Sequence, residues 1–319
     1  GDFTKTQYPD SKADMYAAFI MQAVNMLIPK GFTGLVTMES WMFLSGFEKL
    51  RDLLLTNTQF ISLSHFDWHI MHIAFGTVSF ILQNTKPDSR NGVYSYLNRN
   101  EVDLQNDLPY KFPVKDNGRY NELNQTNFVK IPGHTLGYWI SSNLIYDFQT
   151  GTPLSKIAYP RQGMATTNNE RFLRQWYEVR VSSIKFDGTS ENDTLLGWKW
   201  FPYNKGGSFR KWSGNNDYIV NFQNKGKEIC DYIDSHSAVN HKGRVINRDK
   251  YFQPSVTWSK ISGGDVSFRY KTIGHVFDVA GTSIFGDSYT LDYMIGLLNS
   301  KVVKDILSCL SPTLNYEVG

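Results

Sequence analysis

The densest group of residues suited to binding a polyanion is the segment WKWFPYNKGGSFRKW. Its basic side chains Lys205, Arg210 and Lys211 can neutralise phosphates, and the Gly206–Gly207 backbone can approach a sugar-phosphate chain closely. An aromatic ring such as that of Trp212 can stack on an unpaired base. The combination indicates a nucleic-acid contact. The alternative is a β-hairpin whose aromatic rings fill a core while its basic side chains are solvated.

A second group of candidates surrounds the start of a predicted helix, in the segment RQGMATTNNERFLRQW at residues 161–176. Thr167 or Asn168 can cap a helix that begins near Asn169. A capped helix N-terminus with Gln162 nearby suits a phosphate or a base edge. The alternative is a capped surface helix whose basic face is solvated.

A third group pairs the segment TWSKIS, which contains Lys260, with the segment SFRY, which contains Arg269. Both alternate in the manner of a strand, so Ser259 is expected on the face opposite Trp258 and Lys260. This pattern alone does not distinguish a binding site from an ordinary strand.

Three histidines, His65, His69 and His72, have the spacing of one helix face and invite comparison with a metal site. The one acid nearby, Asp67, would point elsewhere on such a helix, and the stretch lies between two strand-like runs. We therefore expect a loop with partly buried histidines and no metal.

The chain also lacks the usual catalytic signatures. It contains no glycine-rich cofactor loop after a strand, no Walker-type loop, no HExxH and no Gly-x-Ser-x-Gly elbow. The residues by themselves form no complete catalytic site.

Composition limits the class of protein. The 319 residues carry 33 basic and 30 acidic side chains, for a net charge of +3, and 41% are hydrophobic, as in a folded protein. Residues 199–271 alone hold 13 basic and 6 acidic side chains, so the basic excess is local. The two cysteines, Cys230 and Cys309, are too few for a disulfide framework or a Cys-rich zinc module. No apolar run reaches the ~20 residues of a membrane span. We expect a cytoplasmic protein that does not enter the membrane.

Hydrophobic periodicity indicates the elements that position these groups. Spacings of three and four predict helices, and short apolar or alternating runs predict strands. The expected order is helix 13–28, strand 32–38, helix 43–55, strand 60–63 and strand 77–82. This order favours an α/β fold with helices crossing over a largely parallel sheet.

Three domains are expected along the chain: an α/β portion at 1–85, a polar connector at 86–155 and a β-rich α+β domain at 156–319. The last domain ends in a helix at 290–310. The chain opens directly on a crossover helix, whereas a doubly wound sheet begins with strands that feed cofactor loops. The front half of the first domain is therefore expected to be missing.

The segments YPDSKADMYAAFI and GLVTMESWMFLSGFEKLR resemble the adenine-specific DNA methyltransferases of BREX phage-exclusion systems, of which type IIG restriction-modification enzymes are close relatives. Stretches at 162–172, 205–212, 257–262 and 277–285 resemble the target-recognition domain of the same family. The resemblance covers nearly the whole chain and weakens between about 86 and 155.

The resemblance implies that residues 1–85 complete the back half of a Rossmann-like methyltransferase sheet and that a β-rich target-recognition domain follows. Asp14, Met15 and Tyr16 match the family position near the pocket for the flipped base and the cofactor. The cofactor of the full-length enzyme would be S-adenosylmethionine. The glycine motif that binds it and the catalytic Asn-Pro-Pro-Tyr motif are absent from this sequence. The isolated chain is therefore expected to hold no cofactor and to be inactive.

The implied mechanism flips an adenine out of double-stranded DNA and methylates its N6. The recognition domain must first contact phosphates and read base edges. The expected DNA-binding residues are Arg210, Lys211, Lys205, Lys260, Arg269, Gln162, Asn168, Asn169 and Trp212. Further expected partners are the missing N-terminal catalytic half and other phage-defence components.

Three other functions remain open from the sequence. A type IIG enzyme would carry a nuclease domain before this portion. A stand-alone specificity module would bind DNA and leave the chemistry to a partner. Carbohydrate binding by the 8 Trp and 18 Tyr residues would be insensitive to salt, unlike phosphate contacts.

Overall fold

The computed structural model describes residues 2–106, 108–236, 243–262, 265–310 and 316. The chain forms two compact units. Unit 1 comprises Gly1–Gly151 and Ser308–Pro312, and unit 2 comprises Thr152–Leu307 and Thr313–Gly319. Helices and several sheets occur in the two units, so the predicted mixture of α and β structure is confirmed at this coarse level.

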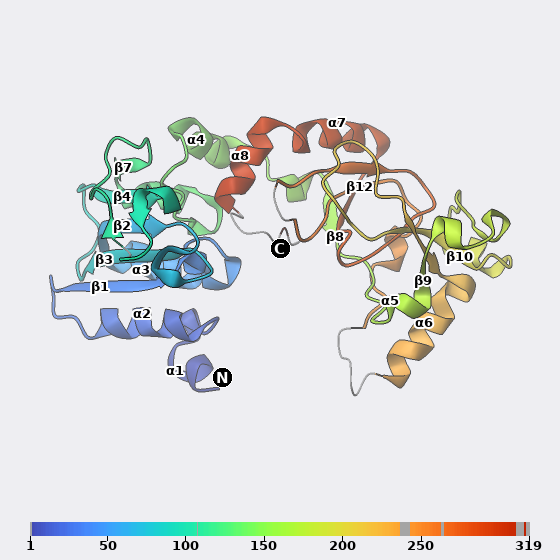
Figure 1. The fold of residues 1–319 in the computed structure, drawn as a ribbon, viewed down its shortest axis with the longest axis horizontal. Coiled ribbons are helices and arrows are strands. Elements are labelled where there is room, and N and C mark those ends of the chain that lie inside the picture. Colours follow the sequence, from blue (N-terminus) through green and yellow to red (C-terminus); the bar gives the residue numbers. More distant parts are fainter. Residues whose placement is uncertain (1, 107, 237–242, 263–264, 311–315, 317–319) are drawn as a thin grey trace. The chain divides into compact units, whose positions relative to one another are not determined.

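Unit 1 is built on a five-stranded sheet with the order β1-β3-β2-β4-β7 (Figure 1). Its strands are β1 (Phe32–Met38), β2 (Gln59–Phe66), β3 (Thr77–Gln83), β4 (Gly92–Leu97) and β7 (Tyr120–Leu123). Its helices are α1 (Asp2–Gln7), α2 (Met15–Asn25), α3 (Glu48–Asn57) and α4 (Ser142–Thr150), and a small ribbon pairs β5 (Val102–Asp103) with β6 (Leu108–Pro109). Strand β1 has the predicted bounds.

The strand directions differ from the predicted, largely parallel sheet. Strands β1 and β2 both pair antiparallel with β3, which lies between them, and within the described strands of this five-stranded sheet only the β2–β4 pair is parallel. The reason is the length of the connections. The short link from β2 to β3 allows only a hairpin, whereas α3 carries the chain from β1 across to β2. Strands β1, β2 and β4 consequently run in one direction.

The core of unit 1 lies between the sheet and its helices. The rings of Trp41, Phe60 and Phe80 are in mutual contact there. Arg51 of α3 is also fully buried, and its guanidinium donates hydrogen bonds of 2.8 Å to three backbone carbonyls, including that of Gly133. These bonds offset the cost of burying a charge and fasten α3 to the segment that precedes α4.

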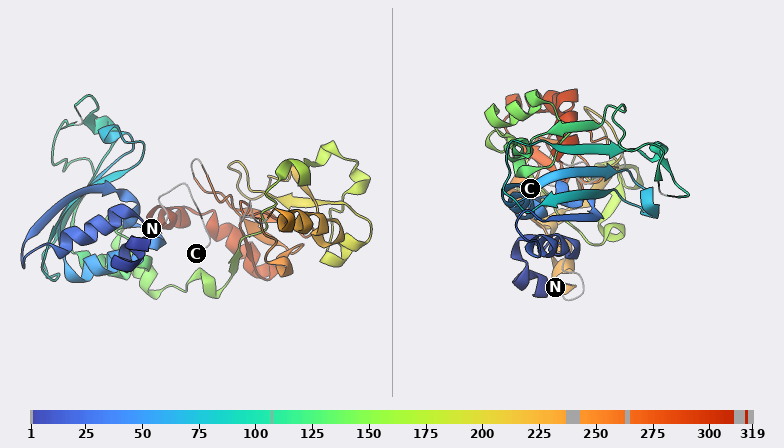
Figure 2. Two further views of the ribbon diagram at one scale, coloured as in Figure 1. Left: turned by 90° about the horizontal axis from the view of Figure 1, so that it is seen from below. Right: turned by 90° about the vertical axis from the view of Figure 1, so that its left-hand side faces the viewer.

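The region predicted as a connector contributes structure to the sheet. Strands β4 and β7 lie within residues 86–155 and extend the sheet beyond β2 (Figure 2). The signal for β4 is an alternating run, GVYSYL, in which Tyr94 is fully buried. Because many Asn, Asp and Pro residues surround this run, the sequence predicted a connector here and not a strand.

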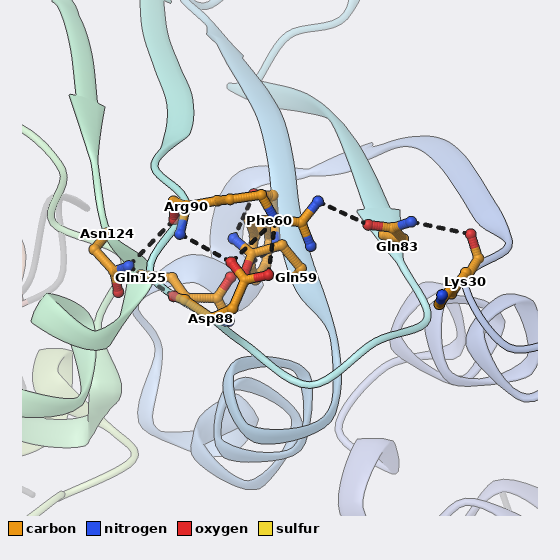
Figure 3. A network of polar contacts seen from close by, with 8 residues as sticks. All are labelled: Lys30, Gln59, Phe60, Gln83, Asp88, Arg90, Asn124 and Gln125. Carbon is orange, nitrogen blue, oxygen red and sulfur yellow. Dashed lines mark hydrogen bonds and ion pairs between the residues drawn. The ribbon is translucent and has the colours of Figure 1, made fainter.

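A network of hydrogen bonds and one ion pair lies at the end of the sheet where β2 begins (Figure 3). The buried Gln125 accepts a 2.7 Å bond from the amide of Phe60, beside the register shift in β2. The Nε of Arg90 donates to both carboxylate oxygens of Asp88, and its Nη1 donates to the side-chain oxygen of Gln83 at 3.3 Å. Internal partners thus satisfy the polar groups at this end.

Unit 2 contains two four-stranded sheets with the orders β14-β10-β11-β9 and β13-β12-β15-β8. The strands are β8 (Tyr159–Arg161), β9 (Leu173–Gln175), β10 (Trp200–Asn204), β11 (Tyr218–Asn221), β12 (Ser255–Thr257), β13 (Arg269–Lys271), β14 (Val276–Phe277) and β15 (Ser283–Phe285). The helices are α5 (Asn169–Phe172), α6 (Gln223–Ser235) and α7 (Ser288–Leu298), and α7 packs against β12 and β13 (Figure 1).

The final helix is interrupted, contrary to the prediction of one helix at 290–310. Helix α7 ends at Leu298, and α8 (Lys301–Leu310) follows. At the break, the amide side chain of Asn299 accepts a 3.1 Å bond from the Phe268 amide and donates a 2.9 Å bond to the Phe268 carbonyl. At the end of α8, Cys309 is buried in the core of unit 1. None of the helices in the described ranges has the length and apolar character to cross a bilayer.

Candidate functional site

The 205–216 loop joins β10 to β11 and carries the densest predicted group. Strand β10 is buried along its length, whereas Phe209 and Trp212 are 53% and 55% exposed at the turn, and Arg210 and Lys211 are exposed beside them. The segment thus divides into a buried strand and an exposed turn. The aromatic strand fills the core of unit 2, and the loop presents two cations and two rings to solvent.

Backbone hydrogen bonds hold the loop against the segment before β13. The amide of Arg210 donates to the Ser267 hydroxyl at 3.1 Å. Trp212 pairs with two residues, donating to the Phe268 carbonyl at 2.9 Å and accepting from the Tyr270 amide at 2.8 Å. The exposed side chains are thus carried on an ordered backbone.

The three lysines predicted to bind DNA differ in their exposure and in their partners within the protein. Lys211 is exposed, and its ammonium group donates to the Asn299 carbonyl at 2.9 Å. Lys205 is half-buried, and its Nζ lies 3.4 Å from a carboxylate oxygen of Asp278. Lys260 is half-buried, and its backbone amide donates to the Ala280 carbonyl at 2.9 Å. Lys211 is the most exposed of the three.

Arg269 is fully buried, which differs from the surface position that a direct phosphate contact requires. Its guanidinium donates to the hydroxyls of Ser267 and Ser259 at 3.0 and 3.1 Å, and to the Arg210 carbonyl at 3.4 Å. Burial lowers its pKa to about 10. Arg269 supports the loop from inside.

The amide side chains of the second group are already engaged within the protein. Asn168 accepts a 3.1 Å bond from the amide of Arg171, which confirms the predicted cap of α5. Gln162 accepts from Arg244 at 2.8 Å, and Asn169 accepts from a neighbouring threonine at 2.9 Å. Of the three amide residues Gln162, Asn168 and Asn169, only Asn169 is exposed. If Gln162 or Asn168 contacted a base, the contact would replace the bond that this side chain makes within the protein.

In unit 1, polar residues gather where three strands end. Met38 of β1 and Phe66 of β2 both lie opposite Thr77, and Leu97 of β4 lies beside Phe66. The carboxyl ends of β1, β2 and β4 therefore meet at one edge of the sheet. Ligands of open α/β sheets bind at this edge.

A chain of hydrogen bonds crosses that edge. Glu39, directly after β1, pairs with Nε2 of the buried His65, whose Nδ1 lies 3.2 Å from the Tyr138 hydroxyl. Burial raises the pKa of the Tyr138 phenol well above its ordinary value. A Cβ at Gly76 would overlap the Glu39 carboxylate, so a larger residue there would displace the Glu39 side chain. The arrangement fixes a carboxylate at the end of β1.

The predicted pocket residues lie at the same edge. The Tyr16 hydroxyl is 2.7 Å from the Ser40 hydroxyl, next to Glu39, and burial raises the pKa of Tyr16 to about 12. Asp14 precedes α2 and makes no side-chain cap to it, and Met15 is 58% exposed. Tyr16 thus ties the start of α2 to the carboxyl end of β1.

The three histidines do not form one face. His65 is buried in β2, while His69 and His72 are exposed in the loop before β3. No group of three metal-binding side chains is present in the part of the chain that the structure describes.

Helix α2 is apolar on two sides. Ala17, Ile20, Met21 and Val24 face the core, whereas Met15, Phe19 and Met26 are 58%, 65% and 74% exposed. The exposed set recurs at helical spacing, and it continues in Ile28, Phe32 and Val36, all more than half exposed. Strand β1 itself pairs only with β3 among the described strands, and α2 lies on its outer side (Figure 2).

Lys271 and Glu39 were not among the predicted site residues, and His65 was considered only as one of three possible metal ligands. Lys271 follows Arg269 by two positions, so a strand places both on one face. The sequence therefore showed that the two side chains share a face. It did not show that this face is buried, because charged residues at alternate positions of a strand normally face solvent. Glu39 and His65 were hidden because only the fold brings the ends of β1 and β2 together.

Comparison with known proteins gives a consistent picture. Residues 2–70 match the family of Eco57I restriction-modification methylases. Adenine-specific methyltransferase BrxX of Escherichia coli O9:H4 (strain HS) is 34% identical over 100% of this chain and 25% of its own length. Adenine-specific methyltransferase PglX of Lacticaseibacillus casei (strain Zhang) is 34% identical over 99% of this chain and 27% of its own length. The chain spans about a quarter of these relatives.

Among solved structures, the type IIL restriction-modification enzyme MmeI in complex with DNA aligns with 96% of this chain and 40% of its own. Its TM-score is 0.57 at 11% identity, so the likeness concerns the fold alone. Together these matches confirm the predicted resemblance to adenine-specific methyltransferases of BREX and restriction-modification systems.

Proposed function

We propose that this chain is the C-terminal portion of a site-specific DNA adenine-N6 methyltransferase that marks host DNA in phage defence. Unit 1 completes the back half of the Rossmann-like catalytic sheet, and unit 2 recognises the target DNA. The observation that carries the proposal is identity of 34% along the whole chain to one quarter of each adenine-specific methyltransferase.

The surface beside β1 supports the assignment of unit 1. A helix that is apolar all round is normally buried, and an unpaired strand edge normally pairs or is blunted by charge. Here Met15 and Phe19 of α2, and Met26 directly after it, are exposed next to the open edge of β1, which bears the exposed Phe32 and Val36. The occupant that we propose for this surface is the preceding, cofactor-binding half of the same sheet.

The carboxyl edge of unit 1 supports a pocket for the flipped adenine and S-adenosylmethionine. Carboxylates such as Asp14 and Glu39 suit the amino group and the positively charged sulfur of the cofactor, and Tyr16 offers a ring and a hydroxyl. When bound, S-adenosylmethionine supplies the methyl group. Asp14, Met15 and Tyr16 line one wall, and the preceding half supplies the others.

The exposed loop supports the assignment of unit 2. Arg210 and Lys211 are placed to contact phosphates, with Lys205 and Lys260 as weaker candidates because each is half-buried. The ring of Trp212, 55% exposed, can stack on a base or pack against a sugar. Asn169 adds an exposed amide at the start of α5.

Methyl transfer to DNA tests the proposal. The intact protein, supplied with labelled S-adenosylmethionine, should methylate adenine in duplex DNA at one sequence. The isolated chain should bind DNA without methylating it. Absence of adenine methylation by the intact protein would refute the proposal, and methylation by the isolated chain would refute its assignment as a portion.

The same assay separates the other functions. Cleavage of DNA beside the methylated site would assign the intact protein to the type IIG enzymes. Methylation that appears only after a separate catalytic subunit is added would make the chain a specificity module. Binding to polysaccharide that does not weaken with salt would favour a carbohydrate-binding protein.

A further inference from the structure

Two buried cations lie behind the exposed 205–216 loop. Arg269 and Lys271 are alternate residues of β13, with exposures of 0% and 2%. Because side chains two apart in a strand share a face, both point to the same side of β13. A buried charge is costly unless polar partners satisfy it, so the partners show what each cation holds in place.

Lys271 holds the end of the loop. Its ammonium group donates to the carbonyls of Gly214 and Asn215, at 2.9 Å each, and to the side-chain oxygen of Asn216. All three hydrogens of the ammonium group thus have acceptors in three consecutive residues. Asn215 in turn donates to the Ser208 carbonyl at 2.9 Å, which joins the two limbs of the loop.

Arg269 holds the beginning of the loop. It donates to the Arg210 carbonyl at 3.4 Å and to the Ser259 hydroxyl at 3.1 Å. Ser259 then donates to the Gly207 carbonyl at 2.7 Å. The two cations therefore fix opposite limbs, and the residues between them project outward.

The backbone of the loop tolerates little displacement. Gly206 has a φ of +78°, and a Cβ there would lie 2.7 Å from the Ala280 carbonyl oxygen. Gly214 has a φ of +116°, and a Cβ there would lie 2.8 Å from the Arg210 side chain. Gly206 thus lies too close to the Ala280 backbone for a side chain, and the positive φ of both glycines disfavours other residues there.

We propose that Lys271 and Arg269 form a buried clamp that sets the shape of the 205–216 loop and thereby determines which DNA sequence the loop prefers. They are positioning residues that act through Arg210, Lys211 and Trp212, and they do not touch DNA. Recognition of base edges depends on side-chain placement to within about 0.5 Å. The inference rests on the proposed function of unit 2 as a DNA reader.

The clamp is tested first without DNA, by trypsin cleavage of the folded full chain after Arg210 and Lys211. Lys271→Met removes the three donors and should accelerate cleavage at these two sites by about tenfold, because the loop opens more often. Lys227→Met is the matched control. It removes one positive charge from an exposed ion pair with Asp231 in α6 and should leave the rate unchanged.

The consequence for DNA is tested with a pool of random duplexes, from which the bound molecules are recovered and sequenced. The unmodified chain and Lys227→Met should enrich the same motif. Lys271→Met should still bind in a salt-dependent manner but should lose the preference at one or more positions. Unchanged cleavage would overturn the clamp, and faster cleavage with an unchanged motif would overturn its role in sequence preference.

Two further results keep the inference separate from the proposed function. If the unmodified chain binds no DNA, the DNA-reading function fails while the cleavage rates still measure the clamp. If Lys271→Met does not fold, Ser259→Ala replaces it. That variant removes the bonds to Gly207 and from Arg269 while keeping both basic side chains, and a rate of cleavage equal to the unmodified chain would then overturn the clamp.

Discussion

The exposed apolar face of α2 leads to a quantitative prediction about Phe19. An aromatic side chain covers about 200 Å², and that of Phe19 is 65% exposed in this chain, which leaves roughly 130 Å² of apolar surface in water. If the preceding half of the catalytic sheet covers it, burial contributes about 3 kcal/mol at about 25 cal/mol per Å². Phe19→Ala should therefore destabilise the intact protein by about that amount, and the isolated chain by less than about 0.5 kcal/mol.

Hydrogen exchange measured by mass spectrometry on peptides that cover α2 gives the free energy of opening this helix in each context. The neighbouring residue provides the control. Ile20 is fully buried against the core, so Ile20→Ala should cost roughly 2–5 kcal/mol in the isolated chain and in the intact protein alike. Equal effects of Phe19→Ala in the two contexts would refute the proposed covering of this face.

Three further predictions concern buried polar groups. Arg51→Met removes three buried hydrogen bonds and should lower the free energy of unfolding of the isolated chain by roughly 2–5 kcal/mol, measured by urea denaturation. Burial lowers the pKa of Lys271 from 10.5 to about 7. Between about pH 7 and pH 10.5, Lys271 is therefore protonated in the unfolded chain and neutral in the folded chain. The stability of the unmodified chain relative to Lys271→Met should therefore rise with pH from about 7 to about 9, and a difference that is constant with pH would contradict this. Burial raises the pKa of Cys309 to about 12, so iodoacetamide at neutral pH should label Cys230 first, and Cys309 only after unfolding, in a peptide map.

Strong local periodicity made several elements predictable. The strand at Phe32–Met38 was predicted with its bounds, and residue type and position narrowed the cap of α5 to Thr167 or Asn168, of which the structure shows Asn168. Such signals are contained within a few residues of sequence. The sheet directions were not predictable in this way, because they depend on the length of the link from β2 to β3 and on the insertion of β3 between two earlier strands.

Residue type alone did not predict which candidate residues are exposed. Arg210 and Trp212 lie on the surface, as a DNA contact requires, but Arg269 is buried by the loop that it supports. Charge in the sequence does not show which cation a neighbouring loop will cover. At the break between α7 and α8, the side chain of Asn299 likewise bonds to a residue distant in sequence, Phe268.

Binding of duplex DNA to the purified chain at ~50 and ~200 mM salt tests whether unit 2 reads DNA. Affinity should fall by orders of magnitude over this range, and replacing Arg210 and Lys211 together by Ala should reduce the salt dependence by about one phosphate contact for each residue that touches DNA. Binding that does not change with salt, or a double variant with the affinity and salt dependence of the unmodified chain, would contradict this role of unit 2.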